Sequence, residues 1–202
     1  VMALIRWNKE YGETLKITLE RFREAHPEYR DSKITYAGRL DPMAEGLLIL
    51  LTDEDVHRKE EFLHLDKTYQ VDFVLGVATD SYDILGLITD TQGARVDEKT
   101  VTASINDLVN IREQEYPPYS SKPVNGKPLW QHQRERSVDK ITIPKRTVTI
   151  SSVITTNRRE IPAPEFKSMI VDAIQRVEGD FRQQEILRSW EKYFNDAPEY
   201  FS

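Results

Sequence analysis

The 202-residue sequence predicts an α+β fold, in which a mixed or antiparallel sheet is flanked by helices. Segments with strand-like and helix-like spacing of apolar residues follow one another, without the strict alternation that a parallel α/β sheet requires. The length suits one substantial core and is short for two. A single domain over residues 1–202 is therefore expected.

Helices are predicted where apolar residues recur every three or four positions. The segment Leu15–Ala25 has this spacing, and Pro27 ends the predicted helix. The same spacing predicts helices over residues 101–109 and 186–194, and a short helix is expected over residues 54–63.

Strands are predicted from apolar runs and from alternation. Residues 3–7 and the continuous apolar run 47–51 read as strands, and residues 69–75 alternate as a half-buried strand does. Residues 147–154 are rich in Thr, Val and Ile, which favours another strand. Residues 169–177 have an ambiguous periodicity, and a strand is one interpretation of them.

Composition excludes several kinds of site. The sequence contains no cysteine, which rules out disulfides, thiolate zinc sites and cysteine nucleophiles. No apolar run reaches the length of a membrane span, and the N-terminal residues lack the layout of a signal peptide. A cytoplasmic protein without a membrane partner is expected.

Charge is distributed unevenly along the chain. The net charge is −6, but the window from Tyr119 to Arg159 holds nine Lys and Arg against two Asp and Glu. That window therefore carries +7 and the remainder −13. Clustered cations bind phosphates, whereas the acidic remainder repels misplaced RNA, so the window is interpreted as an RNA-binding surface.

An acidic loop precedes the apolar run 47–51. Asp41 stands in the sequence Gly38-Arg39-Leu40-Asp41-Pro42 and is followed by a second glycine, Gly46. Two glycines and a proline predict a turn, and the strand behind it provides a rigid support. The pattern indicates a carboxylate that is presented to a ligand.

The segment from Gly38 to Gly46 resembles the catalytic motif of pseudouridine synthases, most closely of the TruB type that modifies the TΨC loop of tRNA. Four further segments resemble motifs of this family in the same order: Asn8–Thr14, Asp66–Tyr69, Leu75–Gly86 and Pro117–Arg134. The resemblance covers roughly residues 5–150, and five ordered matches are far more specific than one. It implies a pseudouridine synthase-like catalytic domain, and the accessory RNA-binding domain that many relatives carry at the C-terminus is expected to be absent.

The resemblance implies the isomerisation of a uridine, U55 of the TΨC loop, to pseudouridine, with no cofactor and no metal. Asp41 is then the nucleophile, which attacks the ribose C1′ or assists formation of a glycal. Tyr69 is expected to stack on the target base and to accept or relay a proton. A strand tyrosine without a chemical role is the alternative for Tyr69.

A cation is expected beside Asp41, because RNA phosphates favour the protonated form of a carboxylate. The family supplies an arginine from a late strand, and Arg182 is the nearest match, one position early. One position on a strand reverses the face, so a bulge or a helix start has to re-aim Arg182. Arg188 and Arg39 are the alternatives.

Several other residues are expected to contact RNA. Tyr36 stands where the family usually has a histidine, and it either stacks in the RNA loop or is an exposed strand tyrosine. A lysine usual in the family is missing from residues 53–57. The complete set of expected RNA contacts is Lys9, Tyr36, Gly38, Arg39, Lys67, Lys122, Gly126, Lys127 and Arg134.

Three hypotheses for function remain after this comparison. The first is a tRNA pseudouridine synthase that binds the TΨC stem-loop, with a monomer favoured. The second is a synthase for ribosomal RNA, because Gly38–Asp41 followed by residues 47–52 also resembles those relatives. The third is a non-catalytic RNA-binding factor, against which the intact Asp41 and Tyr69 weigh.

Overall fold

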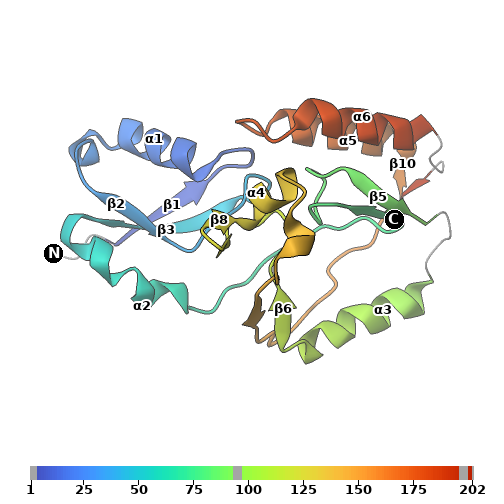
Figure 1. Cartoon of the computed structure of the whole chain (residues 1–202), viewed down its shortest axis with the longest axis horizontal. Coiled ribbons are helices and arrows are strands. Elements are labelled where there is room, and N and C mark those ends of the chain that lie inside the picture. The colour runs from blue at the N-terminus through green and yellow to red at the C-terminus, as the bar shows by residue number, and fades with distance from the viewer. Residues whose placement is uncertain (1–3, 93–96, 196–199, 202) are drawn as a thin grey trace. The chain divides into compact units, whose positions relative to one another are not determined.

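The computed structural model describes residues 4–92, 97–195 and 200–201 (Figure 1). The chain divides into two compact units, which are described separately. Unit 1 comprises residues 1–72 and 168–183, and unit 2 comprises residues 73–167 and 184–202. The expectation of a single catalytic domain stays a prediction.

Unit 1 is built on a three-stranded antiparallel sheet. Strands β1 (Leu4–Lys9) and β2 (Ile34–Ala37) both pair with the central strand β3 (Gly46–Thr52), which gives the order β1-β3-β2. The predicted strand over residues 47–51 is confirmed as β3. The predicted strand over residues 3–7 is β1, although Ala3 itself lies outside the described residues.

Helix α1 (Leu15–Ala25) packs on this sheet and forms the core of unit 1. Phe22, Leu48 and Leu50 are buried together, so α1 and β3 share one apolar layer. Figure 1 shows α1 and the short helix α2 (Glu60–Leu63) on opposite sides of the sheet. The 3₁₀ segments η1 (Pro27–Tyr29) and η2 (Asp53–Arg58) follow α1 and β3, and residues 168–175 of helix α5 (Ala163–Gln175) also belong to this unit.

Unit 2 contains short antiparallel pairs and helices. The pairs are β4 (Val77–Thr79) with β5 (Ile88–Thr91), β6 (Glu113–Glu115) with β9 (Lys145–Thr147), β7 (Pro123–Val124) with β8 (Lys127–Pro128), and β10 (Ile161–Pro162) with β11 (Tyr200–Phe201). The helices are α3 (Glu98–Asp107), α4 (Leu129–Arg134) and α6 (Gln183–Asn195), with 3₁₀ segments η3 (Leu108–Asn110) and η4 (Val138–Lys140).

Helix α6 holds the core of unit 2 together. Trp190 is buried, and its indole Nε1 donates to the carbonyl oxygen of Ile84 at 3.0 Å. The ring of Phe166 meets Trp190 edge-to-face at 6.2 Å, a geometry that aromatic pairs favour. The predicted helix over residues 186–194 is thereby confirmed, and α3 with η3 confirms the one over 101–109.

Two of the predicted strands are wrong because they find no partner strand. No helix or strand forms between Leu63 and Val77, so the alternating segment 69–75 is irregular, and Tyr69 is 65% exposed. In the segment 147–154 only Thr147 is part of a strand, since the last ladder bond runs from the Val148 nitrogen to the Arg112 carbonyl. Alternation of apolar residues does not produce a strand when the backbone has no neighbouring strand with which to form hydrogen bonds.

A third predicted strand, over residues 169–177, is also wrong. These residues lie mostly in α5, whose buried residues Phe166, Ile170 and Ile174 recur every four positions. The helical period therefore prevails over the ambiguous alternation.

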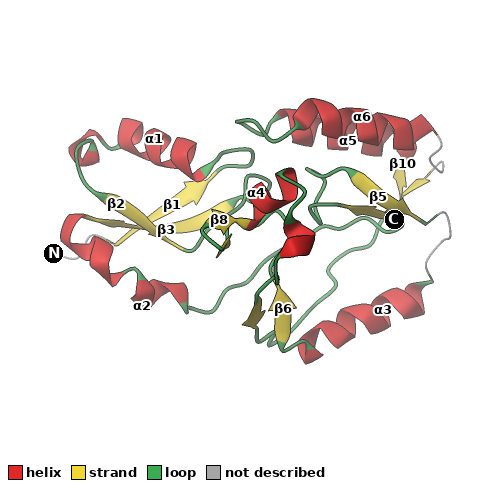
Figure 2. Ribbon diagram, in the orientation of Figure 1, coloured by secondary structure: helices red, strands yellow, loops and turns green. Residues whose placement is uncertain are grey.

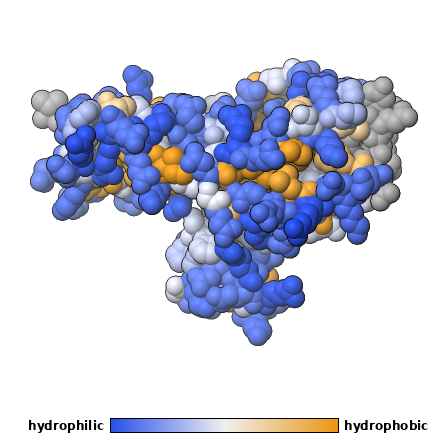
Figure 3. All heavy atoms as spheres, turned by 90° about the horizontal axis from the view of Figure 1, so that it is seen from above, coloured by the Kyte–Doolittle hydropathy of each residue, from blue (hydrophilic) through white to orange (hydrophobic). Residues whose placement is uncertain are grey.

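The fold class is α+β with antiparallel sheets, as the sequence predicts (Figure 2). Within the described residues, no helix is both long and apolar enough to cross a bilayer. Hydrophilic side chains cover most of the face that Figure 3 shows, and apolar side chains appear there in separate patches.

Candidate active site

The loop of residues 38–45 joins β2 to β3 and carries Asp41, whose side chain is exposed. The Ala44 nitrogen donates to the Asp41 carbonyl at 2.9 Å and closes a turn with Pro42 in its second position. Proline suits this position because its fixed φ matches the turn. The carboxylate is therefore presented on a backbone of defined conformation, as expected from the sequence.

Lys9 holds this loop from inside unit 1. Its side chain is fully buried, and its ammonium group donates to the carbonyls of Ala44 at 2.6 Å, Glu10 at 3.1 Å and Pro42 at 3.4 Å. This placement corrects the expectation that Lys9 contacts RNA, because a phosphate outside the protein cannot reach a buried ammonium group. Its contribution to the site is to position the Asp41 loop.

The charges around Lys9 oppose the effect of its burial. Burial lowers the pKa of Lys9 below its ordinary value, and the negative charges of Glu13, Asp41, Glu45 and Glu10 act in the opposite direction. Asp41 is thus one of the carboxylates that favour the charged form of Lys9.

Glu13 is a second buried charge, whose role no motif in the sequence indicates. Its carboxylate accepts from Arg21 Nε at 2.6 Å, from Thr18 Oγ1 at 3.0 Å and from the Glu10 nitrogen at 3.1 Å. Burial alone would raise the pKa of Glu13, but these hydrogen bonds and the charge of Arg21 lower it below its ordinary value. The network ties α1 to the end of β1, beside Gly12, which bonds to the Asp41 loop.

Gly12 connects the Asp41 loop to the segment that precedes Arg182. Its nitrogen donates to the Pro42 carbonyl and its carbonyl accepts from the Glu178 nitrogen, both at 2.9 Å. A Cβ atom on Gly12 would lie 2.2 Å from the carbonyl oxygen of Arg176, and its φ is +88°. Only glycine fits this close approach.

The loop that carries Arg182 is held by the side chain of Gln183. Its amide nitrogen donates to the carbonyls of Gly179 at 2.7 Å and Val177 at 3.0 Å, and its oxygen accepts from the Phe181 nitrogen at 2.9 Å. Arg182 itself has φ +63° and directly precedes α6. Arg182 therefore stands at a helix start and not on a strand. A helix start is one of the two arrangements, with a bulge as the other, that could re-aim this side chain.

Arg176 is a further arginine in this region that sequence reasoning missed. Its guanidinium lies 4.9 Å from the ring centre of Tyr11, and the Tyr11 hydroxyl meets the Met43 sulfur at 3.3 Å. Met43 is two positions from Asp41, so Tyr11 links Arg176 to the Asp41 loop. No motif signals this contact, because it joins residues far apart in the sequence.

The remaining predicted residues of unit 1 are placed less closely around Asp41. In the described residues, no hydrogen bond joins Tyr69 to Asp41, and Tyr69 lies in the irregular segment after α2. The Lys67 ammonium group donates to the carbonyls of Leu65 and Leu63 at 2.7 and 2.9 Å, at the end of α2. Tyr36 packs against the core of unit 1 from β2, and Gly38 and Arg39 lie in the Asp41 loop.

The predicted RNA contacts of unit 2 have different surroundings. Lys127 forms an ion pair with Glu135 at 2.8 Å. Gly126, with φ +81°, lies in the turn between β7 and β8, and Lys122 directly precedes β7. Arg134 ends helix α4 and is exposed. His132 is buried, with its Nε2 at 2.9 Å from the Val124 carbonyl, so it fixes the hairpin and is not a surface histidine.

No group of three or more His, Asp or Glu in the described residues is placed to hold a metal ion. Two surface depressions lie in unit 2, one on α3 and one on the β4–β5 hairpin. Neither includes a residue of the Asp41 loop. The candidate site is therefore defined by the Asp41 loop and the hydrogen bonds beneath it.

Three relatives of this chain carry the same name. A tRNA pseudouridine synthase B of Mesoplasma florum is 33% identical over 153 residues, which are 75% of this chain and 52% of the relative. The enzyme of the same name from Syntrophus aciditrophicus is 39% identical over 60% of this chain and 38% of its own length. That of Burkholderia mallei is 36% identical over 62% of this chain and 41% of its own length. The chain thus spans about half the length of these relatives or less.

The match to a family covers most of the site described above. Residues 26–184 match the model of the TruB family pseudouridylate synthase (N terminal domain). This span exceeds half of the 202 residues and contains both the Asp41 loop and Arg182. The chain belongs to the TruB family of pseudouridylate synthases.

Proposed function

We propose that this chain isomerises a uridine in tRNA to pseudouridine, with U55 of the TΨC loop as the target and Asp41 as the nucleophile. The observation that carries the proposal is the Asp41 loop, an exposed carboxylate whose backbone is held by Lys9 and Gly12. Membership of the TruB family and the names of the relatives support it. Acting on tRNA, the protein is expected to work in the cytoplasm.

The proposed reaction breaks one bond and forms another without redox change. The Asp41 carboxylate attacks the ribose C1′ or assists glycal formation, and the bond from C1′ to N1 of uracil breaks. The uracil turns within the site and C5 bonds to C1′, which breaks the bond from C1′ to the Asp41 carboxylate where that bond has formed. The proton on C5 then leaves and N1 gains a proton, so product and substrate are isomers. A fixed carboxylate suits the first step, because misplacement of a reacting group is costly.

Tyr69 and Arg182 are proposed to complete the site. Tyr69 would stack on the target base and take part in removing the C5 proton, and its exposure leaves the ring accessible to RNA. Arg182 would pair with the Asp41 carboxylate, and two observations support this role. Gly12 bonds to both loops, and Gln183 fixes the Arg182 loop.

The tRNA is proposed to bind as a stem-loop to a monomer of this chain. Lys122, Lys127 and Arg134 would contact the phosphates. Lys127 is already paired with Glu135, so we expect it to contribute less to RNA affinity than Lys122 and Arg134 do. A bound phosphate has to compete with a carboxylate at Lys127.

Mapping of pseudouridines tests the proposal against synthesis in ribosomal RNA. We expect purified chain to convert U55 in a tRNA transcript and to leave ribosomal RNA unmodified. Cells lacking the protein should lose the same pseudouridine from tRNA. Loss from ribosomal RNA alone would favour the second substrate, and no loss from either would favour a non-catalytic RNA-binding factor.

A further inference from the structure

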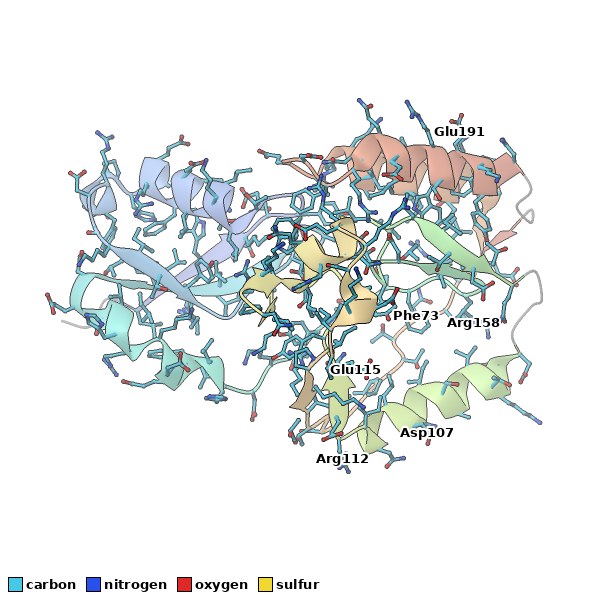
Figure 4. All side chains as sticks on the ribbon, in the orientation of Figure 1. Phe73, Asp107, Arg112, Glu115, Arg158 and Glu191 are labelled. Carbon is cyan, nitrogen blue, oxygen red and sulfur yellow. The ribbon has the colours of Figure 1, made fainter. Side chains whose placement is uncertain are left out.

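The β6–β9 ribbon of unit 2 has two faces of different charge. Its register places Gln114 opposite Arg146 and Glu115 opposite Lys145. Side chains alternate between the faces of a strand, so Gln114 and Arg146 share one face, and Glu115 and Lys145 share the other. Lys145 and Glu115 form an ion pair at 3.5 Å on their face. Figure 4 labels Glu115, the last residue of β6, and Arg112, which directly precedes this strand.

Arg146 is fixed on its face by uncharged groups. Its Nε and Nη2 donate to the Gln114 Oε1 at 3.2 and 2.7 Å, and its guanidinium lies 5.6 Å from the ring centre of Tyr116. Tyr116 extends the ribbon, since its nitrogen donates to the Pro144 carbonyl at 3.2 Å. Alternation places Tyr116 on the same face as Gln114, which agrees with its contact to Arg146.

Lys122 approaches the same ring from a different segment. The Ser120 nitrogen donates to the Pro117 carbonyl at 2.9 Å and turns the chain back after Tyr116. The Lys122 nitrogen then bonds to Ser120 Oγ at 3.1 Å, and its ammonium group lies 5.3 Å from the Tyr116 ring centre. The Lys122 carbonyl accepts from the Leu129 nitrogen at 3.0 Å, which anchors this connection to α4.

We propose that Tyr116, Lys122 and Arg146 form a binding site for the phosphodiester backbone of the RNA substrate. Within the described residues, neither cation forms an ion pair, although both lie on one aromatic ring. Two like charges on one ring, 5.3 and 5.6 Å from its centre, repel each other, and a bound anion reduces that repulsion. The ring fixes both cations in advance, which lowers the entropy lost on binding.

A polymer of phosphates fits this surface better than a small free anion does. Lys122 and Arg146 are exposed and Tyr116 is half-buried, and neither the depression on α3 nor the one on the β4–β5 hairpin includes them. Small ligands are usually enclosed by a pocket, whereas backbone phosphates are bound on open cationic surfaces. This site rests on the proposed function, and it selects Lys122 and Arg146 from the nine basic residues between Tyr119 and Arg159.

The test measures binding of a labelled TΨC stem-loop to the full chain over a series of KCl concentrations. The variants are Lys122→Gln, Arg146→Gln and the double variant, and the matched control is Lys145→Gln. The control removes the same charge from the neighbouring residue on the opposite face of the ribbon. Each of the two single variants should lower the slope of log affinity against log salt by about 0.7 to 0.9, and the double variant by roughly 1.4 to 1.8. Lys145→Gln should leave the slope unchanged.

Tyr116→Leu is a further variant, which keeps both charges. We expect it to weaken binding about two- to fivefold while the salt slope stays the same. Equal slopes for the wild type and the double variant, or an equal loss in Lys145→Gln, would overturn the proposed site. Wild-type affinity in Tyr116→Leu would overturn the role of the ring.

Pseudouridine formation by the wild type is measured on the same RNA. Product without a change of slope in the variants would leave the proposed function standing and remove this site. A change of slope without product would support this site and overturn the proposed function. Failure of the wild-type chain to bind the stem-loop would overturn the site and the function together.

Discussion

Replacing Gly12 by alanine tests the connection between the two loops of the candidate site. The new Cβ would meet the Arg176 carbonyl oxygen at 2.2 Å, so the backbone of one segment has to move. Alanine at φ +88° adds about 1–2 kcal/mol of strain. The two backbone hydrogen bonds of Gly12, each at 2.9 Å, contribute about 0.5–1.5 kcal/mol apiece. Together these effects predict a loss of about 2–5 kcal/mol in the free energy of unfolding.

Gly126→Ala is the matched control for this change. Gly126 has φ +81°, but a Cβ added there meets nothing within 4 Å. The control therefore has the backbone strain without the clash, and its free energy of unfolding should fall by about 1–2 kcal/mol. Urea denaturation measures both variants. Turnover of Gly12→Ala on tRNA should fall as well, because a displacement near 1 Å costs up to about 100-fold. Equal stability of the two variants, or normal turnover in Gly12→Ala, would refute the reasoning.

Three further changes have defined outcomes. Tyr69→Phe should bind RNA as the wild type does and form little product, and normal turnover would show that the hydroxyl transfers no proton. Lys9→Met should lower the free energy of unfolding by about 1–3 kcal/mol, since the Ala44 carbonyl loses its donor; an unchanged urea midpoint would contradict this. The stabilisation that ionised Glu13 supplies is present above its ordinary pKa of 4.5 and is lost as pH falls through its lower folded pKa. Glu13→Gln should therefore be less stable at neutral pH and lose less stability in acid, and parallel pH profiles would argue against the network.

Local sequence signals predicted the elements that bury an apolar face. Helix α1 and strand β3 formed as expected because Phe22 and Leu48 meet in one core. The turn at Asp41 was predictable from its glycines and Pro42, since their φ preferences are properties of single residues. These parts of the fold depend on neighbours in the sequence.

The parts that the sequence did not reveal depend on contacts between distant residues. The alternating segment 69–75 looks like a strand, but pairing requires a partner that no local pattern identifies. Lys9 looks like a surface cation in a motif, yet three carbonyls in the fold enclose it. Arg176 carried no signal, because its partner Tyr11 becomes a neighbour only after folding.

The central claim is that Asp41 is the nucleophile, and Asp41→Asn tests it most directly. The amide is nearly isosteric with the carboxylate, so affinity for the TΨC stem-loop should stay close to that of the wild type. Single-turnover formation of pseudouridine at saturating tRNA should fall below about one per cent of wild type, since loss of a nucleophile costs several orders of magnitude. Asp31→Asn, at an exposed aspartate before β2, is the control and should turn over normally. Asp41→Asn with turnover above about one per cent would contradict the account.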